Sequence, residues 1–448
     1  MAKSADVDIL VVGAGVLGVT LVYWLSNLYD CTLALADIEE AAGMHTSSRN
    51  TGVIHRPFYL DPHKKRVFAQ TSRISHTMWE RLAKDAGLPW MPIGTFNIAL
   101  EQSEVRTLEQ YRAWGMENGM EEKELELLDG RGVSALEPEV RCRAALVSKT
   151  DVSVDFGVFT RHLSRYLAGR GVRFLGGQRV VSVAKEGDGL RVDADTSSGR
   201  ASTHCRFLIN AAGGGAIGMA HACGLAKDYT SLNFRGEYWV VDEPFASKVT
   251  SNIYRPPRFP KFPFLDPHFV VRADGSRQIG PNAVMVPGPY VYSGVGLRES
   301  GAFLERPVEP KLRLMTNPDF VSLVAGEWRS SLSKRSMCGR VKNFVPGLDI
   351  TMLNRRAVFG VRTSVINASG FVPEAILLKG DSSAHIINYN SPGATGAPSF
   401  SALVVASLRD DGSLDGFRRR DASPVLSGWD FGVASAASVG RIGSGQRL

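Results

Sequence analysis

The stretch of sequence that decides the fold runs from Asp8 to Asp37 and reads DILVVGAGVLGVTLVYWLSNLYDCTLALAD. It opens with an apolar run long enough for one buried strand and continues through the glycine turn Gly13-x-Gly15-x-x-Gly18. The apolar positions then change to helical spacing, and a second apolar run ends at Asp37. The stretch therefore predicts a strand, a turn, a helix and a second strand that ends on an acidic residue.

This unit has the pattern of a dinucleotide-binding site. Gly13 allows a sharp turn, Gly15 lets the backbone approach a pyrophosphate, and Gly18 lets the helix pack closely on the strand. The N-terminus of the helix that follows offers unpaired N–H groups and a positive dipole end to phosphates; Val16 lies in this turn. Asp37 is placed to accept hydrogen bonds from a ribose hydroxyl.

The uncharged run from Ile9 to Leu25 has a second interpretation. Its length and apolarity also resemble a signal anchor or a short membrane span. The glycines at functional spacing, the nearby Asp8 and the lack of a strongly basic leader argue against that interpretation.

Length and composition are those of an ordinary soluble protein with two joined domains. The chain has 448 residues, of which 44% are hydrophobic and 22% charged. The net charge of +7 suits nucleic acid, a membrane surface or a small anionic substrate. No basic run is interleaved with aromatic residues, so we expect no nucleic-acid partner. Membrane association is compatible with the charge, but no amphipathic anchor supports it.

The cysteines give no sign of a metal site. There are five of them, and none is spaced as CxxC. We therefore predict no metal and no disulfide framework, and reduced thiols fit a cytoplasmic location.

A loop rich in hydroxyl and amide groups, residues 43–55, follows the nucleotide unit. It contains Ser48, Arg49 and Asn50 and ends in the apolar step Gly52-Val-Ile-His55. Such a loop can wrap a pyrophosphate and the edge of a flavin ring. A polar surface loop is the alternative, but it would not explain the apolar step.

Apolar periodicity predicts the elements farther along the chain. We expect helices within residues 64–87, 101–130, 158–169, 309–339 and 399–408, and strands at 172–174, 178–183, 190–194 and 207–213. The last strand ends at Gly213, and residues 384–408 repeat the order of strand, glycine-rich turn and helix. Both places can deliver backbone groups to a cofactor.

Aromatic, proline and arginine residues concentrate after Phe234. This composition is typical of a rigid pocket for an anionic small molecule. An irregular edge of a second sheet with solvated arginines is the alternative.

With these motifs in view, the chain resembles FAD-dependent enzymes of the D-amino-acid oxidase superfamily, and within it the L-2-hydroxyglutarate oxidase/dehydrogenase group. The resemblance covers nearly all of residues 8–408. Its motifs are Gly13-Ala-Gly15-Val-Leu-Gly18, Arg49-Asn-Thr-Gly-Val-Ile-His55, Phe234-Arg-Gly-Glu-Tyr238, Pro263-Phe-Leu with His268, Gly280-Pro-Asn-Ala283, Gly360-Val-Arg362 and Asn390-Ser-Pro-Gly-Ala-Thr395.

The resemblance implies a non-covalently bound FAD whose N5 takes a hydride from the Cα of a 2-hydroxy acid, with oxygen or a quinone as the electron acceptor. It also implies a mixed α/β fold, in which a Rossmann-like FAD-binding domain is interleaved with a substrate domain built on an antiparallel sheet. The implied cofactor contacts are Gly13, Gly15, Val16, Gly18, Asp37, Ser48, Arg49, Asn50, Val53, Val181, Ala212, Gly213, Gly393, Ala394, Thr395 and Gly396.

The expected domains are discontinuous. The FAD-binding domain takes residues 1–80, 145–230 and 355–415, and the substrate domain takes residues 81–144 and 231–354. Residues 416–448 are expected to form a loose C-terminal tail.

The resemblance also places the chemistry. His55 and His268 match histidine positions of the family and are the candidates for the base that takes the hydroxyl proton, because a neutral imidazole is available near pH 7. For each, a structural hydrogen-bonding role is the alternative. Arginine forks suit the carboxylate groups of an anionic substrate. The expected substrate contacts are Arg362, Arg235, Tyr59, Arg56 and Tyr238.

The chain departs from the family pattern directly after His55, where Arg56 and Pro57 replace small residues. A second departure is Pro373-Glu-Ala-Ile, which replaces an expected acidic and aromatic segment. We expect a bulkier or differently charged pocket, and this leaves 2-hydroxyglutarate itself open as the substrate.

Three functions follow from these observations. The first is oxidation of the CH–OH group of a small 2-hydroxy acid, with L-2-hydroxyglutarate as one candidate. The second is an amine or amino-acid oxidase, or a tailoring oxidase of a secondary pathway, in the same superfamily. The third is a flavin-binding subunit without catalysis, against which the retained histidines and arginines argue.

Overall fold

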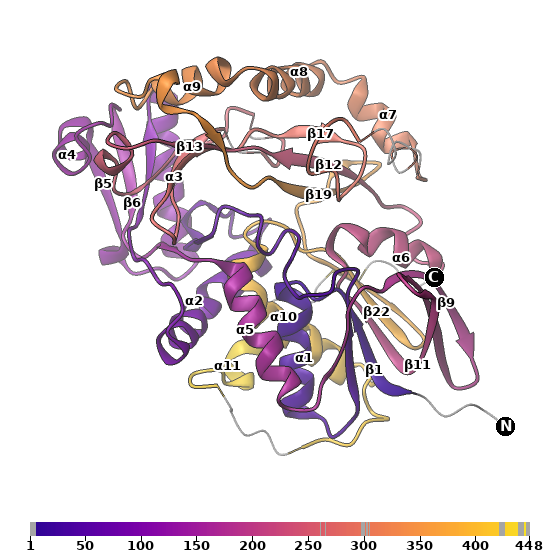
Figure 1. The fold of residues 1–448 in the computed structure, drawn as a ribbon. Helices are drawn as coiled ribbons and strands as arrows, with labels where there is room; N and C mark the ends of the chain where they lie inside the picture. Colours follow the sequence, from indigo (N-terminus) through magenta and orange to yellow (C-terminus); the bar gives the residue numbers. More distant parts are fainter. Residues whose placement is uncertain are drawn as a thin grey trace.

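The computed structural model describes residues 6–259, 261–264, 266–296, 301, 303, 305–420 and 426–437, and the backbone of residues 443–444. The chain folds into two layers (Figure 1). One layer carries the Asp8 to Asp37 unit, and the other carries the aromatic segment that follows Phe234.

The first layer is built on a sheet with a parallel centre. β1 (Val7–Val12) pairs in parallel with β2 (Leu33–Ala36) on one side and β11 (Gly199–Asn210) on the other. β11 pairs in parallel with β22 (Ser383–Asn388). The sheet is completed by β8 (Arg173–Leu175), β9 (Arg179–Glu186), β10 (Gly189–Thr196), β21 (Ile376–Gly380) and β23 (Gly443–Ser444). Parallel pairing brings the carboxyl ends of β1, β2, β11 and β22 to the same edge of the sheet.

Side chains of β1 alternate between two apolar clusters. Ile9 and Val11 pack with the helices α1 (Val16–Leu28), α2 (Arg66–Ala86), α5 (Phe156–Ala168) and α10 (Gly393–Asp410). Leu10 and Val12 pack with residues of the β9–β10 hairpin on the opposite face. The sheet is therefore covered on both faces, as a parallel sheet requires.

Burial on every side explains the long apolar run in the opening stretch. α1 packs against the sheet, α5 and α10 at once, and nearly all of its residues are buried. Among the residues that the structure describes, no helix is both long and apolar enough to cross a membrane.

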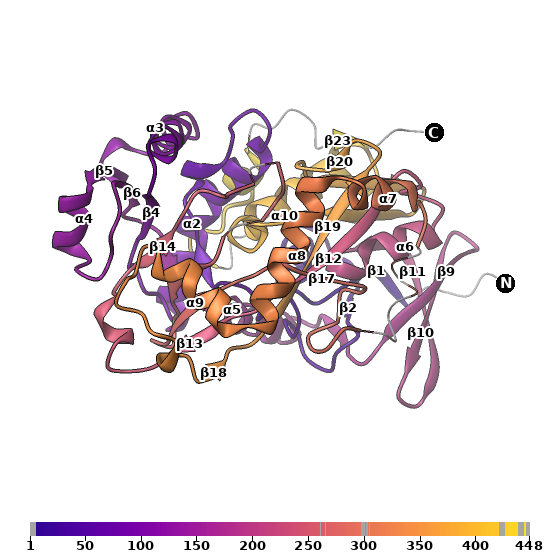
Figure 2. The same ribbon diagram turned by 90° about the horizontal axis from the view of Figure 1, so that it is seen from above.

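The second layer is largely antiparallel. One sheet has the order β18 (Arg355–Arg356), β13 (Trp239–Val241), β16 (Arg277–Gly280), β15 (His268–Val271), β14 (Asn252–Tyr254), β4 (Thr95–Ala99), β6 (Ala144–Ser148) and β5 (Leu125–Asp129). A second sheet has the order β17 (Val284–Val286), β12 (Thr230–Gly236), β19 (Gly360–Asn367) and β20 (Gly370–Phe371). Seen from above, α8 (Pro318–Leu332) and α9 (Lys334–Lys342) lie over these strands (Figure 2).

This architecture confirms the predicted fold class, with two differences in detail. Strand pairing puts β6 and β19 in the second layer, whereas the expected boundaries assigned most of β6 and all of β19 to the FAD-binding domain. The helices expected within residues 101–130 are α3 (Gln102–Glu117), the 3₁₀ turn Glu122–Glu124 and α4, which begins at Gly130; residues 125–129 form the strand β5. The exposed charged residues of β5, Glu126 and Asp129, resemble a solvated helix in sequence, but the pairing of β5 with β6 decides its conformation.

The expected loose tail is wrong for residues 426–437. Trp429 is buried, and its Nε1 donates a hydrogen bond to the carbonyl oxygen of Met78 at 2.9 Å. The Ser399 hydroxyl on α10 donates to the carbonyl oxygen of Ala434 in α11 (Phe431–Ser435) at 2.6 Å. The segment therefore packs against α10 and adds aromatic surface to the apolar cluster that contains Ile9 and Val11.

Candidate active site

A cavity of about 340 Å³ is lined by residues of both layers. Its wall in the first layer includes Gly15 and Val16, most of the loop from Thr46 to His55, and residues 386–395. Its wall in the second layer includes Phe234, Tyr238 and His268, together with Gly360 to Thr363 on β19. The cavity thus joins the predicted nucleotide site to the predicted substrate site.

Two glycines of the opening motif are required by close approach of the backbone. Gly13 has φ +104°, and a Cβ there would lie 2.4 Å from the carbonyl oxygen of Ala211. A Cβ on Gly18 would lie 1.8 Å from the carbonyl oxygen of Gly13. Larger residues cannot be accommodated, so the turn and the close helix packing need glycine as predicted.

Ser47 contacts the N-terminus of α1, whereas the sequence pointed to Ser48. The Ser47 hydroxyl accepts a hydrogen bond from the Val16 N–H at 2.9 Å and lines the cavity. Ser48 points elsewhere: its hydroxyl donates to the carbonyl oxygen of His45 at 3.3 Å, and its Cβ lies against Gly157. In a loop of consecutive hydroxyl residues, only the backbone conformation decides which one faces the ligand.

Asp37 is tied to the glycine turn itself. Its carboxylate accepts hydrogen bonds from the Ala14 N–H at 2.6 Å and from the Glu39 N–H at 2.9 Å. Burial raises the pKa of this carboxyl above its usual range. Asp37 lies outside the cavity lining of the structure, and its expected contact with ribose stays a prediction.

The remaining predicted cofactor residues divide into two groups. Those that line the cavity are Arg49, Asn50, Val53, Gly213, Gly393, Ala394 and Thr395. Val181, Ala212 and Gly396 do not line it. Val181 is 39% exposed on β9, and a Cβ on Gly396 would lie 2.2 Å from the Tyr389 hydroxyl, so that glycine serves helix packing.

The residues present fit an FAD. Helices α1 and α10 both begin at the cavity wall, so the positive end of each helix dipole lies at the cavity. α10 begins at Gly393, six residues earlier than the helix expected at 399–408, so the glycine-rich segment forms its first turn. A Cβ on Gly360 would lie 1.8 Å from the carbonyl oxygen of Arg49, so the substrate sheet closes directly on the cofactor loop.

Arg362 is a cation at the cavity wall without a carboxylate partner. It forms no ion pair with a described acidic residue, and its Nε has no hydrogen-bond partner among them. Burial lowers the pKa of this guanidinium to about 10. A desolvated guanidinium that lines a cavity is suited to bind an anion from outside the chain.

A second cation lies close to Arg362. Lys65 precedes α2 and is half-buried. Burial, together with the positive charge of Arg362, lowers the pKa of Lys65 to about 8. No sequence motif pointed to Lys65.

Two other predicted substrate arginines are held by carboxylates of the chain. Arg235 Nη2 lies 2.8 Å from Glu237 Oε1, and its Nη1 donates to the carbonyl oxygen of Gly294 at 2.7 Å. Arg56 Nη2 lies 2.7 Å from Glu124 Oε1. Neither arginine lines the cavity, so the structure does not place them as substrate contacts.

The two predicted tyrosines lie in different places. Tyr238 lines the cavity, and its hydroxyl is 3.2 Å from that of Thr51. Tyr59 does not line it; its ring packs edge-on against His55 with the ring centroids 5.7 Å apart. Burial raises the pKa of the Tyr59 phenol above its ordinary value.

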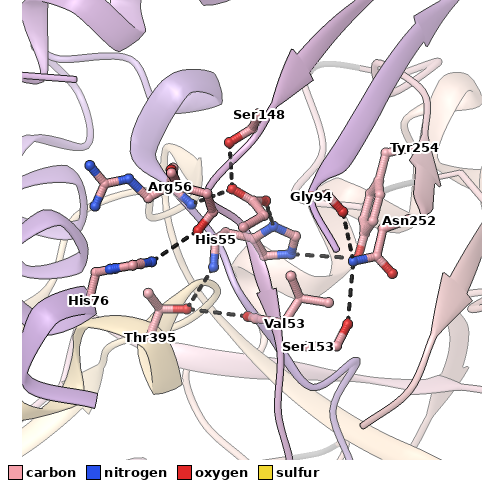
Figure 3. Close-up of polar contacts among 12 residues, drawn as sticks. Val53, His55, Arg56, His76, Gly94, Ser148, Ser153, Asn252, Tyr254 and Thr395 are labelled. Carbon is pink, nitrogen blue, oxygen red and sulfur yellow. Dashed lines mark hydrogen bonds and ion pairs between the residues drawn. The ribbon is translucent and has the colours of Figure 1, made fainter. Parts of the chain in front are cut away.

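Both candidate histidines line the cavity. His55 Nδ1 lies 2.9 Å from Asp151 Oδ2, and its Nε2 lies 3.5 Å from the Tyr254 hydroxyl (Figure 3). The His268 ring stacks on Tyr254 with the centroids 4.0 Å apart. Its Nδ1 is 3.1 Å from the carbonyl oxygen of Asp266, and its Nε2 has no hydrogen-bond partner in the described chain.

The two imidazoles differ in their surroundings. Burial lowers the pKa of His268 to about 3, so that ring stays neutral at physiological pH. His55 instead has the Asp151 carboxylate beside it. Asp151 and Tyr254 carry no motif of their own, and only the pairing of distant strands brings them to His55.

Comparisons with known proteins agree with this arrangement. The profile of the family described as DAO, FAD dependent oxidoreductase, matches residues 8–407. The mitochondrial L-2-hydroxyglutarate dehydrogenase of Caenorhabditis elegans is 26% identical to the chain, covering 93% of it and 96% of the relative. L-2-hydroxyglutarate dehydrogenase of Salmonella houtenae is 23% identical, covering 93% of this chain and 97% of the relative.

Solved structures share the fold. FAD-bound L-alpha-glycerophosphate oxidase from Mycoplasma pneumoniae superposes with a TM-score of 0.68 at 20% identity, covering 94% of this chain and 97% of the other. Glycine oxidase from Geobacillus kaustophilus superposes with a TM-score of 0.66 at 15% identity, covering 91% and 95%. The chain therefore belongs to the DAO family of FAD dependent oxidoreductases and is an enzyme that uses FAD.

Proposed function

We propose that this oxidoreductase oxidises the CH–OH group of a small 2-hydroxy acid, with L-2-hydroxyglutarate as the first candidate. The observation that carries the proposal is Arg362, a cavity-lining guanidinium without a carboxylate partner in the described chain. A substrate carboxylate would compensate its buried charge and fix the α-carbon in the cavity. FAD, when bound, supplies the acceptor for the hydride that leaves this carbon.

The histidines favour a hydroxyl over an amine. A hydroxyl must lose its proton as the carbonyl forms, so its oxidation needs a base within hydrogen-bond reach. A neutral amine can expel hydride with the help of its own lone pair. The imidazoles of His55 and His268, both at the cavity wall, supply an acceptor for the hydroxyl proton.

The charge around Arg362 supports a substrate with two carboxylates. Lys65 does not itself line the cavity, but its charge lies close enough to act on Arg362, and no described acidic side chain pairs with either cation. The relatives named L-2-hydroxyglutarate dehydrogenase are named for such a dicarboxylate. Oxygen or a quinone is the acceptor that we propose for the electrons, and a cytoplasmic location stays a prediction from the cysteine pattern.

The test is anaerobic mixing of the FAD-loaded enzyme with matched panels of 2-hydroxy acids and 2-amino acids. Bleaching of the oxidised flavin absorbance by hydroxy acids, and strongest by dicarboxylic ones, is the expected result. Bleaching by amino acids alone would replace the proposal with an amino-acid oxidase, the second hypothesis from the sequence. The enantiomer of each active acid serves as the control for a defined binding orientation.

A further inference from the structure

Asp151 is a carboxylate without solvent contact, placed just after β6. It is 0% exposed, and among the described residues its one ion-pair partner is the imidazole of His55. Its Oδ1 accepts hydrogen bonds from the Ser148 hydroxyl at 2.6 Å and from the Arg56 N–H at 2.9 Å. Its Oδ2 faces His55 Nδ1, so the carboxylate is fixed from both sides.

The loop that carries Asp151 is itself held in place. His76 on α2 lies with Nε2 2.9 Å from the carbonyl oxygen of Thr150. The Thr150 hydroxyl donates to Glu124 Oε1 at 2.9 Å, and Glu124 pairs with Arg56. Arg56 and Glu124 therefore support the position of Asp151, and this gives Arg56 a structural place in the site that its sequence position did not reveal.

Contact with a carboxylate decides the tautomer of His55. A carboxylate can only accept, so the neutral His55 carries its proton on Nδ1 and its lone pair on Nε2. Nε2 faces Tyr254 at 3.5 Å, a distance at the outer limit of a hydrogen bond. A substrate hydroxyl at a shorter distance is the stronger donor to that lone pair.

The same reasoning gives His268 a different role. Its Nδ1 donates to the carbonyl oxygen of Asp266, which also leaves the lone pair on Nε2. No described carboxylate forms an ion pair with the imidazole of His268. The charge of Asp266 favours a protonated ring, but burial outweighs it and keeps the imidazole neutral. His268 can accept a hydrogen bond but is poorly suited to keep a proton.

We infer that Asp151 is a positioning residue that makes His55, rather than His268, the base of the reaction. The inference rests on the proposed function. As the substrate O–H bond breaks, its proton forms a bond to His55 Nε2, and Asp151 stabilises the resulting imidazolium. The electron pair of the broken O–H bond becomes the second bond of the carbonyl group, and FAD, when bound, would accept the C–H electron pair as hydride.

Several charged or titratable groups face His55 and bear on its protonation. They are Asp151 after β6, Tyr254 on β14, His268 on β15 and Tyr59 after β3 (Val53–Ile54), together with Arg362 on β19, which lines the same cavity.

The test compares Asp151→Asn with Ser148→Ala in the FAD-loaded enzyme. The amide of Asp151→Asn can donate to Nδ1, which moves the His55 proton to Nε2 and removes the acceptor. The rate constant of flavin reduction should fall by about 10²–10⁴-fold, with KM changed little and the acidic limb of its pH profile lost. Ser148→Ala keeps the carboxylate and should cost less than about tenfold. His268→Gln should raise KM more than it lowers the rate constant.

A second measurement needs no substrate. NMR of the FAD-loaded enzyme with isotope-labelled histidine should show His55 as the Nδ1–H tautomer, assigned with His55→Gln. Asp151→Asn should convert this signal to the Nε2–H form.

A wild-type His55 protonated on Nε2 overturns the inference even where the variant does not fold. If the tautomer is as expected but no hydroxy acid bleaches the flavin, the dyad stands and the proposed substrate class is wrong. Flavin reduction in Asp151→Asn at the wild-type rate and pH profile also overturns the inference.

Discussion

The guanidinium of Arg56 lies 2.7 Å from the carboxylate of Glu124, and the two side chains are only 10% and 11% exposed. The sequence placed Arg56 among the substrate contacts, but this ion pair holds it in the wall behind the cavity. Removing one partner leaves an uncompensated charge in a site with little water.

The first prediction concerns this pair. Arg56→Met or Glu124→Gln alone should lower the free energy of unfolding by about 3–5 kcal/mol, because each leaves a buried charge unpaired. The double variant should recover much of that loss, as measured by urea denaturation. A variant of Arg56 with unchanged stability and a raised KM would return this arginine to the substrate site.

The second prediction concerns Arg362. Arg362→Ala should weaken capture of the substrate by about 2–5 kcal/mol, because the substrate carboxylate would then be buried without its partner. The measurement is the apparent second-order rate constant of anaerobic flavin reduction. Arg235→Lys is the matched control, since Arg235 is already paired with Glu237. An unchanged rate in Arg362→Ala removes Arg362 from the site.

The third prediction separates dicarboxylic from monocarboxylic substrates. Lys65→Met keeps most of the length of the unbranched side chain but removes its charge near Arg362. The KM for a dicarboxylic 2-hydroxy acid should rise about tenfold, as expected for one partly screened charge pair. The KM for a monocarboxylic analogue should stay the same. An equal rise for both would show that Lys65 does not contact the second carboxylate.

The fourth prediction concerns acid stability. Burial lowers the pKa of His268 to about 3 and that of His385 to about 4, below the value of 6.5 for a free side chain. The unfolded chain therefore binds more protons below pH 6.5 than the folded chain. The stability from neutral burial is fully present above pH 6.5 and is lost as the pH falls toward 4.

Below pH 6.5, each histidine should lower the free energy of unfolding by up to about 1.4 kcal/mol for each unit that the pH falls. Urea denaturation between pH 4 and 7, with excess FAD, measures this free energy. The variant with both histidines changed to glutamine should show a flatter profile. A profile as steep as that of the wild type would assign the acid sensitivity to other groups.

Local sequence was enough to predict the nucleotide end of the site. Gly13 and Gly18 are both required by close contacts with nearby backbone. Gly18 lies against Gly13 in the same turn, and Gly13 lies against Ala211, which follows the neighbouring strand β11. Such contacts depend on short-range geometry, and a fixed residue spacing records them. The same logic located the α10 turn, although Ser47 rather than Ser48 faces the cavity.

The substrate end could be predicted only as a set of residue types. Arg362, Arg235 and Arg56 are equivalent in sequence as planar cations near aromatic residues. Whether an arginine meets a carboxylate of its own chain or faces a cavity depends on strands that pair over long distances, such as β12 with β19.

The sequence by itself thus determined the FAD-binding fold, because its signals lie within single supersecondary units. Only the tertiary structure decided which arginine lines the cavity without a carboxylate partner in the described chain, and which histidine stands beside a buried carboxylate. Asp151 lies far along the chain from His55, and their contact exists because the antiparallel pair of β3 with β7 (Val152–Ser153) brings the two residues together.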